Sequence, residues 1–175
     1  MELIDLLGIS PSTAVVDVGG GASSLVDRLV KRGFTDISVL DISAAALEAG
    51  HRRVGESAPV QWLHEDLLVW QPGRRFGLWH DRAVFHFLTD EVDRERYLAA
   101  LASGLEPGGA LVMATFAEDG PEFCSGLPVL RYSSEELVDV LGRGFRAVAT
   151  RRELHTTPSG VVQPFTWLAA RSASN

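Results

Sequence analysis

The chain has 175 residues, of which 46% are hydrophobic and 22% charged, and its formal net charge is -7 at pH 7. The acidic balance argues against a nucleic-acid-binding protein, and the single cysteine excludes an internal disulfide framework. There is no run of about 18 apolar residues that could span a membrane, and the first residues do not resemble a signal peptide, so we expect a cytoplasmic protein.

Strand-like and helix-like segments alternate along the chain. Short apolar runs bounded by Gly or Pro predict strands, and apolar positions at helical spacing predict helices. The predicted strands are residues 13–19, 37–42, 60–64, 76–84, 110–116, 145–155 and 163–171. The predicted helices are residues 23–33, 43–56 and 89–104, and a fourth that begins at a capping box of Ser133 and Glu136.

This alternation predicts an α/β fold with a parallel sheet and helices on both faces. The last two strands are separated only by residues 156–160, which is too short for a parallel crossover, so they pair antiparallel or lie apart. We expect a single domain over residues 1–175. A short segment at residues 1–12 could add one or two helical turns through the apolar residues Leu3, Ile4, Leu6 and Leu7.

The most informative motif joins the first strand to the first helix, at residues 15–24. Three consecutive glycines follow Asp17, and glycine lets the backbone approach a ligand closely because no Cβ intervenes. The helix that follows offers free backbone N–H groups. The second strand ends in Asp41, where an acid can accept hydrogen bonds from ribose hydroxyls. Together these features predict a site for a nucleotide-type cofactor, although the glycines alone could form only a tight turn.

The glycine pattern separates two cofactor classes. The dinucleotide fingerprint G-x-G-x-x-G fails, because Ser24 stands at its third glycine. The pattern D/E-x-G-x-G-x-G fits Asp17, Gly19 and Gly21, with Ser23 in place of the last glycine. Through this loop the chain resembles class I S-adenosylmethionine-dependent methyltransferases, and residues 39–42, 65–67 and 105–111 carry the same resemblance. Residues 79–88 resemble those of a bacterial subgroup of small methyltransferases.

The resemblance implies a Rossmann-like doubly wound sheet, mostly parallel with an antiparallel last strand, in the order 3-2-1-4-5-7-6. It implies S-adenosylmethionine as the cofactor and S-adenosylhomocysteine as the product. Ile42 would then pack on the adenine ring, Asp66 would meet the adenine amino group, and the N–H of Leu67 a ring nitrogen. The full set of expected cofactor-binding residues is Asp17, Gly19, Gly20, Gly21, Ser23, Asp41, Ile42, Asp66 and Leu67. Asp41 and Asp66 could also simply cap the helix or turn that follows each of them.

Three residues at or just after the end of the fourth strand are candidates for catalysis. His80 and Asp81 end that strand at the carboxyl edge, where ligands bind in open α/β sheets. In strand geometry they point to opposite faces, and the resemblance implies that Asp81 lines the active site while His80 is structural or on the substrate side. His86 is interpreted as a core or rim residue, and His80 or His86 could instead act as a general base, since histidine titrates near neutral pH. Arg82 is interpreted as an ion-pair partner of Asp81 or another acid. No metal site is predicted.

The methyl acceptor is predicted less directly. The loop at residues 117–132 contains Cys124, interpreted as a half-buried thiol, and the chain lacks the Pro–Cys and Asn-Pro-Pro-Tyr motifs of base-modifying DNA methyltransferases. Few insertions favour a small-molecule acceptor over a protein. A protein lysine methyltransferase and a non-catalytic S-adenosylmethionine-binding module remain alternatives. A nicotinamide-dependent reductase is disfavoured, because Lys31 is the only lysine and no Tyr-x-x-x-Lys pair exists.

The segment before the first strand is short, so we expect little or no lid over the cofactor. The site would then be open, or completed by another chain in a homo-oligomer. This predicts weak cofactor affinity, and submicromolar binding by the isolated monomer, measured by calorimetry, would contradict it.

Overall fold

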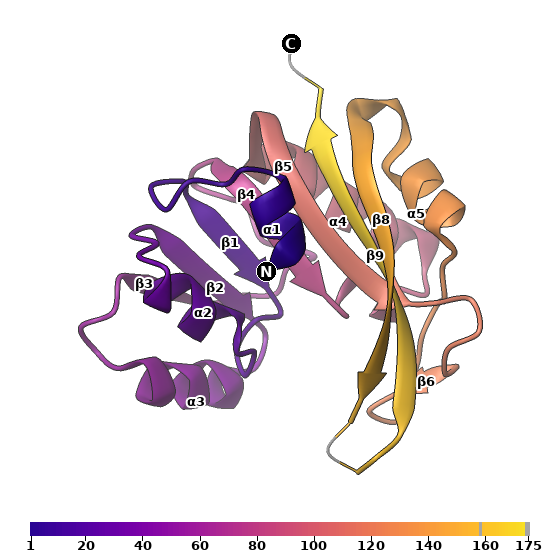
Figure 1. Ribbon diagram of the computed structural model, residues 1–175, viewed down its shortest axis with the longest axis horizontal. Helices are drawn as coiled ribbons and strands as arrows, with labels where there is room; N and C mark the ends of the chain where they lie inside the picture. Colours follow the sequence, from indigo (N-terminus) through magenta and orange to yellow (C-terminus); the bar gives the residue numbers. More distant parts are fainter. Residues whose placement is uncertain (158, 174–175) are drawn as a thin grey trace.

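The computed structural model describes residues 1–157 and 159–173. Within that part of the chain, a seven-stranded sheet has the order β3-β2-β1-β4-β5-β9-β8 (Figure 1). Its strands are β1 (Val15–Val18), β2 (Ile37–Asp41), β3 (Val60–His64), β4 (Phe76–Arg82), β5 (Leu105–Phe116), β8 (Phe145–Thr156) and β9 (Val162–Ser172). The short strands β6 (Phe123–Cys124) and β7 (Leu127–Pro128) pair separately. The helices are α1 (Glu2–Leu6), α2 (Leu25–Lys31), α3 (Ala44–Val54), α4 (Glu91–Gly104), α5 (Ser134–Leu141) and the 3-10 turns η1 (Phe85–Phe87) and η2 (Gly142–Gly144).

The topology is the one the sequence predicts. Strands β1 to β5 pair parallel, β9 runs antiparallel to β5, and β8 runs antiparallel to β9. Because the numbering counts β6 and β7, this order is the predicted 3-2-1-4-5-7-6. The Rossmann-like, doubly wound sheet with an antiparallel last strand is therefore confirmed. No helix among the described residues is long and apolar enough to cross a membrane.

Helices cover both faces of the sheet. Helices α1, α2 and α3 pack on one face, through buried residues such as Leu3, Leu29 and Leu47. Helices α4 and α5 pack on the other, through Tyr97 and Leu137 among others. Side chains along a strand alternate between these two clusters, as strand geometry requires. A sheet buried on both faces explains why the central strands are continuous apolar runs.

Local capping fixes the helix starts as predicted. The side chain of Ser43 accepts a hydrogen bond from the backbone N–H of Ala46, which caps α3. Ser133 and Glu136 form the predicted capping box at α5, each side chain accepting from the other residue's backbone N–H. Helix α4 begins after Asp90, whose carboxylate accepts from the N–H of Val92.

The start of β5 differs from the prediction. The sequence predicts a strand only from Ala110, because Pro107, Gly108 and Gly109 favour a turn, but the strand begins at Leu105. Its pairing with β4 jumps from Leu105 to Ala110, so the Pro-Gly-Gly segment forms a bulge inside the strand. Gly108 adopts φ +73, a conformation that glycine tolerates. Pairing on both sides of the bulge outweighs the local preference for a turn.

The β8–β9 hairpin extends beyond the other strands of the sheet. Strand β9 pairs with β5 only as far as Phe165 and Phe116, while the β8–β9 pairing continues to Thr156 and Val162. In Figure 1 the hairpin therefore extends below the lower edge of the sheet, where the parallel strands end. The extended part of the hairpin therefore lies beside the carboxyl edge of the sheet, where ligands are expected to bind.

Candidate cofactor and acceptor site

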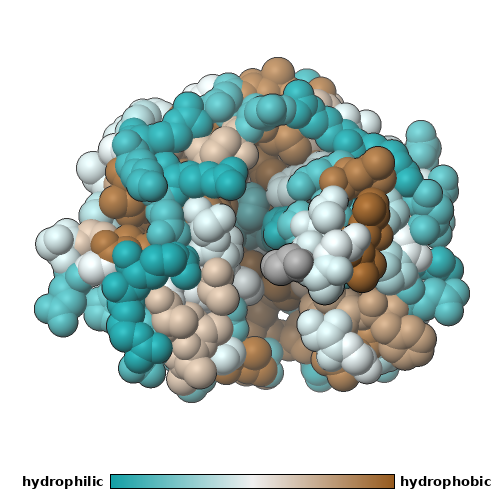
Figure 2. All heavy atoms as spheres, turned by 60° about the horizontal axis from the view of Figure 1, so that its bottom comes forward, coloured by the Kyte–Doolittle hydropathy of each residue, from teal (hydrophilic) through white to brown (hydrophobic). Residues whose placement is uncertain are grey.

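The carboxyl ends of the parallel strands bring the predicted site residues to one edge of the sheet. Asp17, Asp41 and His80 lie at or near the ends of β1, β2 and β4, which are neighbours in the sheet. Figure 2 shows this edge hollowed between the side of the molecule that carries α3 and the side that carries the β8–β9 hairpin. Open α/β sheets bind ligands at this edge, next to the strand where the order reverses.

Each glycine of the loop meets a neighbour that leaves no room for a side chain. Gly19 has φ +67, and a Cβ there would collide with the side chain of Val84. A Cβ on Gly20 would collide with the carboxylate of Asp17. A Cβ on Gly21 would lie 2.8 Å from Oδ2 of Asp41. The loop is thus packed closely on the two carboxylates that the sequence assigns to the cofactor.

Asp17 and His80 form a buried pair beside this loop. They are register partners on β1 and β4, and Nδ1 of His80 lies 2.7 Å from Oδ1 of Asp17. Only 1% of Asp17 and 4% of His80 is exposed. Oδ2 of Asp17 is buried and has no hydrogen-bond partner in the described part of the chain. A buried carboxylate oxygen without a donor is unfavourable, so this atom is suited to accept from a ligand such as an ammonium group.

Asp41 holds the glycine loop and the start of α3 together. Its Oδ2 accepts from the N–H of Gly21 at 3.0 Å, and its Oδ1 from the N–H of Ser43 at 2.8 Å. The helix cap itself is Ser43 rather than Asp41. An ionised carboxylate has about four acceptor positions, so capacity remains for the two hydroxyls of a ribose.

The residues expected around an adenine ring lie at the ends of β2 and β3. Ile42 is 69% exposed, and its carbonyl lies 3.1 Å from Nε2 of His64. Asp66 accepts from the N–H of Leu68, as the turn-capping alternative anticipated. Within the residues that the structure describes, the N–H of Leu67 has no partner. An exposed apolar side chain after β2 and a free backbone N–H after the neighbouring strand β3 are groups suited to holding a flat heterocycle.

Ser23, at the position of the third glycine, serves the helix that follows. Its Oγ accepts from the N–H of Leu25, the first residue of α2, at 3.1 Å. Its carbonyl accepts from Nη2 of Arg53 on α3. Serine thus fixes the end of the loop where the family pattern has a glycine.

Asp81 points to the opposite face from His80, as strand geometry requires, and is fully buried. Its carboxylate accepts from the N–H groups of Val84 and Phe85 at 2.9 and 3.2 Å. Ala83 adopts φ 67, which turns the chain back over the carboxylate. Burial raises the pKa of Asp81 to about 6, against the lowering effect of these hydrogen bonds. Asp81 thus ties the end of β4 to η1 and does not reach the hollow.

His86 also lies in the interior. Its Nδ1 accepts from the N–H of Phe116 at 3.3 Å, and Nε2 is buried with no partner among the described residues. Burial lowers the pKa of His86 to about 4, so its imidazole is neutral at pH 7. Of the three catalytic candidates, the structure places only His80 beside the glycine loop.

The pKa of Asp81 predicts a measurable effect of pH on stability. The folded pKa of about 6 exceeds the ordinary value of 3.8, so the stabilising contribution of Asp81 is full well below pH 3.8 and is lost as pH rises through 6. We expect the stability of the wild type relative to Asp81→Asn to fall by about 2 kcal/mol between pH 4 and 7. Urea unfolding followed by tryptophan fluorescence measures this difference. A difference that stays constant within about 1 kcal/mol would contradict it.

Arg82 is not the ion-pair partner that the sequence suggested. No carboxylate within residues 1–157 and 159–173 lies within 4.0 Å of its guanidinium. Its Cζ instead lies 5.0 Å from the centre of the Phe165 ring. Sequence reasoning missed this partner, because the pairing depends on the register of distant strands. The one local signal is the spacing of Gln163, Phe165 and Trp167, which lie two residues apart in a predicted strand and so share one face of it.

The comparisons with known proteins agree with this geometry. The family described as a methyltransferase domain matches residues 15–109, and the chain belongs to that family. A malonyl-[acyl-carrier protein] O-methyltransferase of Ilyobacter polytropus is 27% identical over 146 residues, covering 77% of this chain and 53% of the relative. A trans-aconitate 2-methyltransferase of Rhizobium leguminosarum is 34% identical over 113 residues, covering 62% of this chain and 42% of the relative. The chain spans about half the length of these curated relatives.

Solved structures share the fold. The N-methyltransferase NodS from Bradyrhizobium japonicum, in complex with S-adenosylhomocysteine, superposes with a TM-score of 0.76 at 16% identity, covering 98% of this chain and 84% of that one. A Burkholderia thailandensis 1,6-didemethyltoxoflavin-N1-methyltransferase has a TM-score of 0.78 at 21% identity, covering 99% and 76%. The resemblance to class I methyltransferases is therefore confirmed for family and fold.

Proposed function

We propose that this chain is an S-adenosylmethionine-dependent methyltransferase that acts on a small or carrier-linked acceptor. The observation that carries the proposal is the unsatisfied Oδ2 of Asp17, buried against Gly20 in a loop with the family's glycine spacing. Membership of the methyltransferase domain family supports it. So does the presence of S-adenosylhomocysteine in solved structures of the same fold.

Four of the predicted cofactor residues lie in surroundings that support a role in binding. Oδ2 of Asp17 would accept from the ammonium group of the methionine part, and Asp41 from the ribose hydroxyls. Ile42 would cover one face of the adenine ring, and the Leu67 N–H would meet its edge. When bound, S-adenosylmethionine supplies an electrophilic methyl group on a sulfonium. Positioning of the acceptor in line with that group then accounts for much of the expected rate.

His80 is the residue we propose for moving a proton. With Nδ1 facing Asp17, the tautomer that donates to the carboxylate leaves Nε2 as an acceptor. Nε2 has no partner within the described residues, so it is available to take a proton from an acceptor hydroxyl or amine. Asp81 and His86, for which catalytic roles are expected from the sequence, are buried in structural contacts, so we assign them to positioning the segment after β4.

The names of the relatives support the proposed class of acceptor. The two curated relatives are named for malonyl-[acyl-carrier protein] and trans-aconitate, and both names denote acceptors that are carboxylic acids. The solved neighbour from Burkholderia is named for a small heterocycle. These names favour a small or carrier-linked acceptor over a protein lysine. Because the chain spans about half of its curated relatives, their particular acceptors are not transferred to it.

Isotope transfer tests the proposal. The chain is incubated with S-adenosylmethionine labelled on the methyl group and a panel of small carboxylates, amines and thiols, with unrelated proteins in parallel. We expect label in a small molecule, and His80→Asn should lower the rate for an acceptor that must lose a proton by about 100-fold or more. Label found only in protein would favour the lysine methyltransferase. Tight cofactor binding with no transfer to any acceptor would favour the binding module.

A further inference from the structure

Five side chains at the end of the β8–β9 hairpin and of β4 share one face of the sheet. The register aligns Arg82 with Ala114, Ala114 with Trp167, and Phe165 with Glu153, so these positions lie on the same side as His80. His155, two residues beyond Glu153, lies on that side as well, with its ring 6.1 Å from that of Phe165. The group comprises Arg82, Glu153, His155, Phe165 and Trp167, and is called the hairpin face below.

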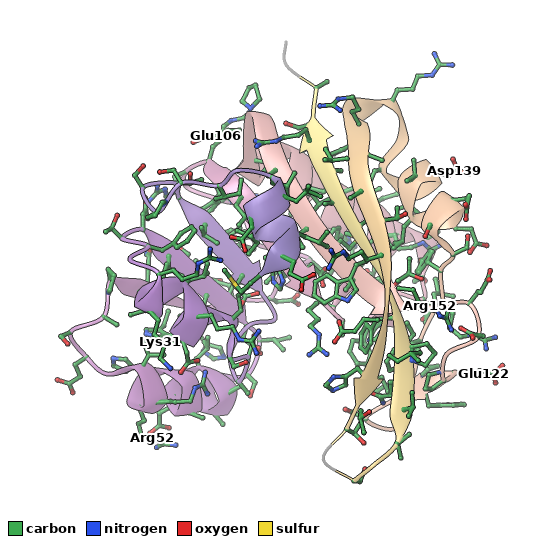
Figure 3. The ribbon with its side chains drawn as sticks, viewed as in Figure 1. Lys31, Arg52, Glu106, Glu122, Asp139 and Arg152 are labelled. Carbon is green, nitrogen blue, oxygen red and sulfur yellow. The ribbon has the colours of Figure 1, made fainter. Side chains whose placement is uncertain are left out.

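Arg82 is held in this face without a counter-charge. Its guanidinium lies over the Phe165 ring, and it has neither an ion pair nor a hydrogen bond within the described residues. Glu153, the acid nearest in register, accepts from Nε1 of Trp167 at 2.6 Å instead. Arg152, from the same strand, contrasts with Arg82. It points to the other face of the hairpin (Figure 3) and pairs with Asp119 at 2.6 Å.

A guanidinium that rests on an aromatic ring has one face covered and its edge of N–H donors free. That edge matches a carboxylate, which it can bind through two parallel hydrogen bonds. Contact with the ring limits the motion of the side chain, so less conformational entropy is lost on binding. The geometry of Arg82 is therefore that of an anion-binding residue, and the aromatic rings beside it exclude part of the competing water.

The position of Arg82 shows where the hairpin face lies relative to the proposed cofactor loop. Arg82 follows Asp81, whose register partner Val18 precedes Gly19. His80, two residues earlier on the same face, lies 6.0 Å from the Trp167 ring, centre to centre. An anion bound at Arg82 would thus lie between the glycine loop and the hairpin, next to the proposed proton acceptor.

We propose that Arg82, stacked on Phe165, binds a carboxylate group of the methyl acceptor, with His155 and Trp167 completing the pocket wall. The acceptor is then a small molecule that carries a carboxylate, whichever of its other groups takes the methyl, rather than a neutral or purely cationic molecule. The identification of the bound molecule as a methyl acceptor rests on the proposed function, whereas the anion site itself does not depend on methyl transfer.

Three probes with the same ring and different charge test the site: benzoate, benzamide and benzylamine. Each is titrated into the ¹⁵N-labelled chain, with and without S-adenosylhomocysteine, and the indole N–H signal of Trp167 is followed by NMR. We expect benzoate to shift this signal and to bind at least about 10-fold more tightly than the other two. Arg82→Gln should weaken benzoate binding by about 10-fold or more, and Arg82→Lys by less, since lysine keeps the charge but not the fork.

Arg143→Gln is the matched control, because Arg143 is exposed in η2 and its replacement removes the same charge. It should bind benzoate within about 2-fold of the wild type. The proposal is overturned if benzoate leaves the Trp167 signal unchanged, if benzamide or benzylamine binds equally well, or if Arg82→Gln retains benzoate affinity. Binding of S-adenosylhomocysteine is recorded on the same samples. If that fails while benzoate binds through Arg82, the proposed function falls and the anion site stands.

Discussion

Replacing His80 by alanine should lower the free energy of unfolding at pH 7 by about 3–5 kcal/mol, a large fraction of the stability of a domain this size. The reason is the partner it leaves behind. Asp17 is 1% exposed and its Oδ2 already has no donor within the described residues. Without Nδ1 of His80, both oxygens of a buried carboxylate would lack a partner. Urea unfolding followed by tryptophan fluorescence measures the change.

His80→Asn separates this structural role from the proposed proton transfer. The asparagine amide can donate to Asp17 from near the position of Nδ1 but offers no basic nitrogen in place of Nε2. We expect His80→Asn to recover most of the lost stability while methyl transfer stays slow. If His80→Ala unfolds within about 1 kcal/mol of the wild type, the pair does not stabilise the fold in the way its geometry indicates.

Asp41→Asn should weaken binding of S-adenosylhomocysteine by about 10- to 100-fold. The substitution removes the charge and one of the two acceptor oxygens, and hydrogen bonds to a charged acceptor contribute about 1.5–3 kcal/mol each. Stability should fall by about 1 kcal/mol, because the amide oxygen can still accept from one of Gly21 and Ser43 while the amide NH2 cannot accept from the other. Isothermal titration calorimetry gives both dissociation constants.

Asp36→Asn is the matched control for that measurement. Asp36 immediately precedes β2, whose other end is Asp41, and pairs with Arg74 at 2.6 Å. The control removes the same charge far from the glycine loop and should bind S-adenosylhomocysteine like the wild type. Equal weakening in the two variants would mean that net charge, rather than a contact of Asp41, sets the affinity.

Local sequence patterns were sufficient to predict the order of strands and helices and the position of the glycine loop. The apolar runs and glycines around Asp17 and Asp41 located the loop, and the spacing of Ser133 and Glu136 located the start of α5. These features depend on neighbours in sequence, such as caps, turns and strand ends. The short connection before β9 likewise limited the last two strands to antiparallel pairing or separation, and they pair antiparallel. The carboxyl edge follows from topology alone.

The orientation of catalytic candidates could not be obtained in this way. Alternation indicates that His80 and Asp81 point to opposite faces, but which face meets the loop depends on the register of β1 against β4. The burial of Asp81 further depends on the turn at Ala83, whose positive φ is a conformation that alanine rarely adopts. The stacking of Arg82 on Phe165 joins residues far apart in sequence. Such contacts are set by tertiary pairing and leave little trace in local composition.

The most direct test of a methyl-donor site at the glycine loop is a calorimetric titration of the chain with S-adenosylhomocysteine and, separately, with NAD. We expect saturable binding of S-adenosylhomocysteine that Asp41→Asn weakens, and no binding of NAD at the same concentrations. Binding of NAD without binding of S-adenosylhomocysteine would contradict the assignment of the glycine loop to a methyl donor.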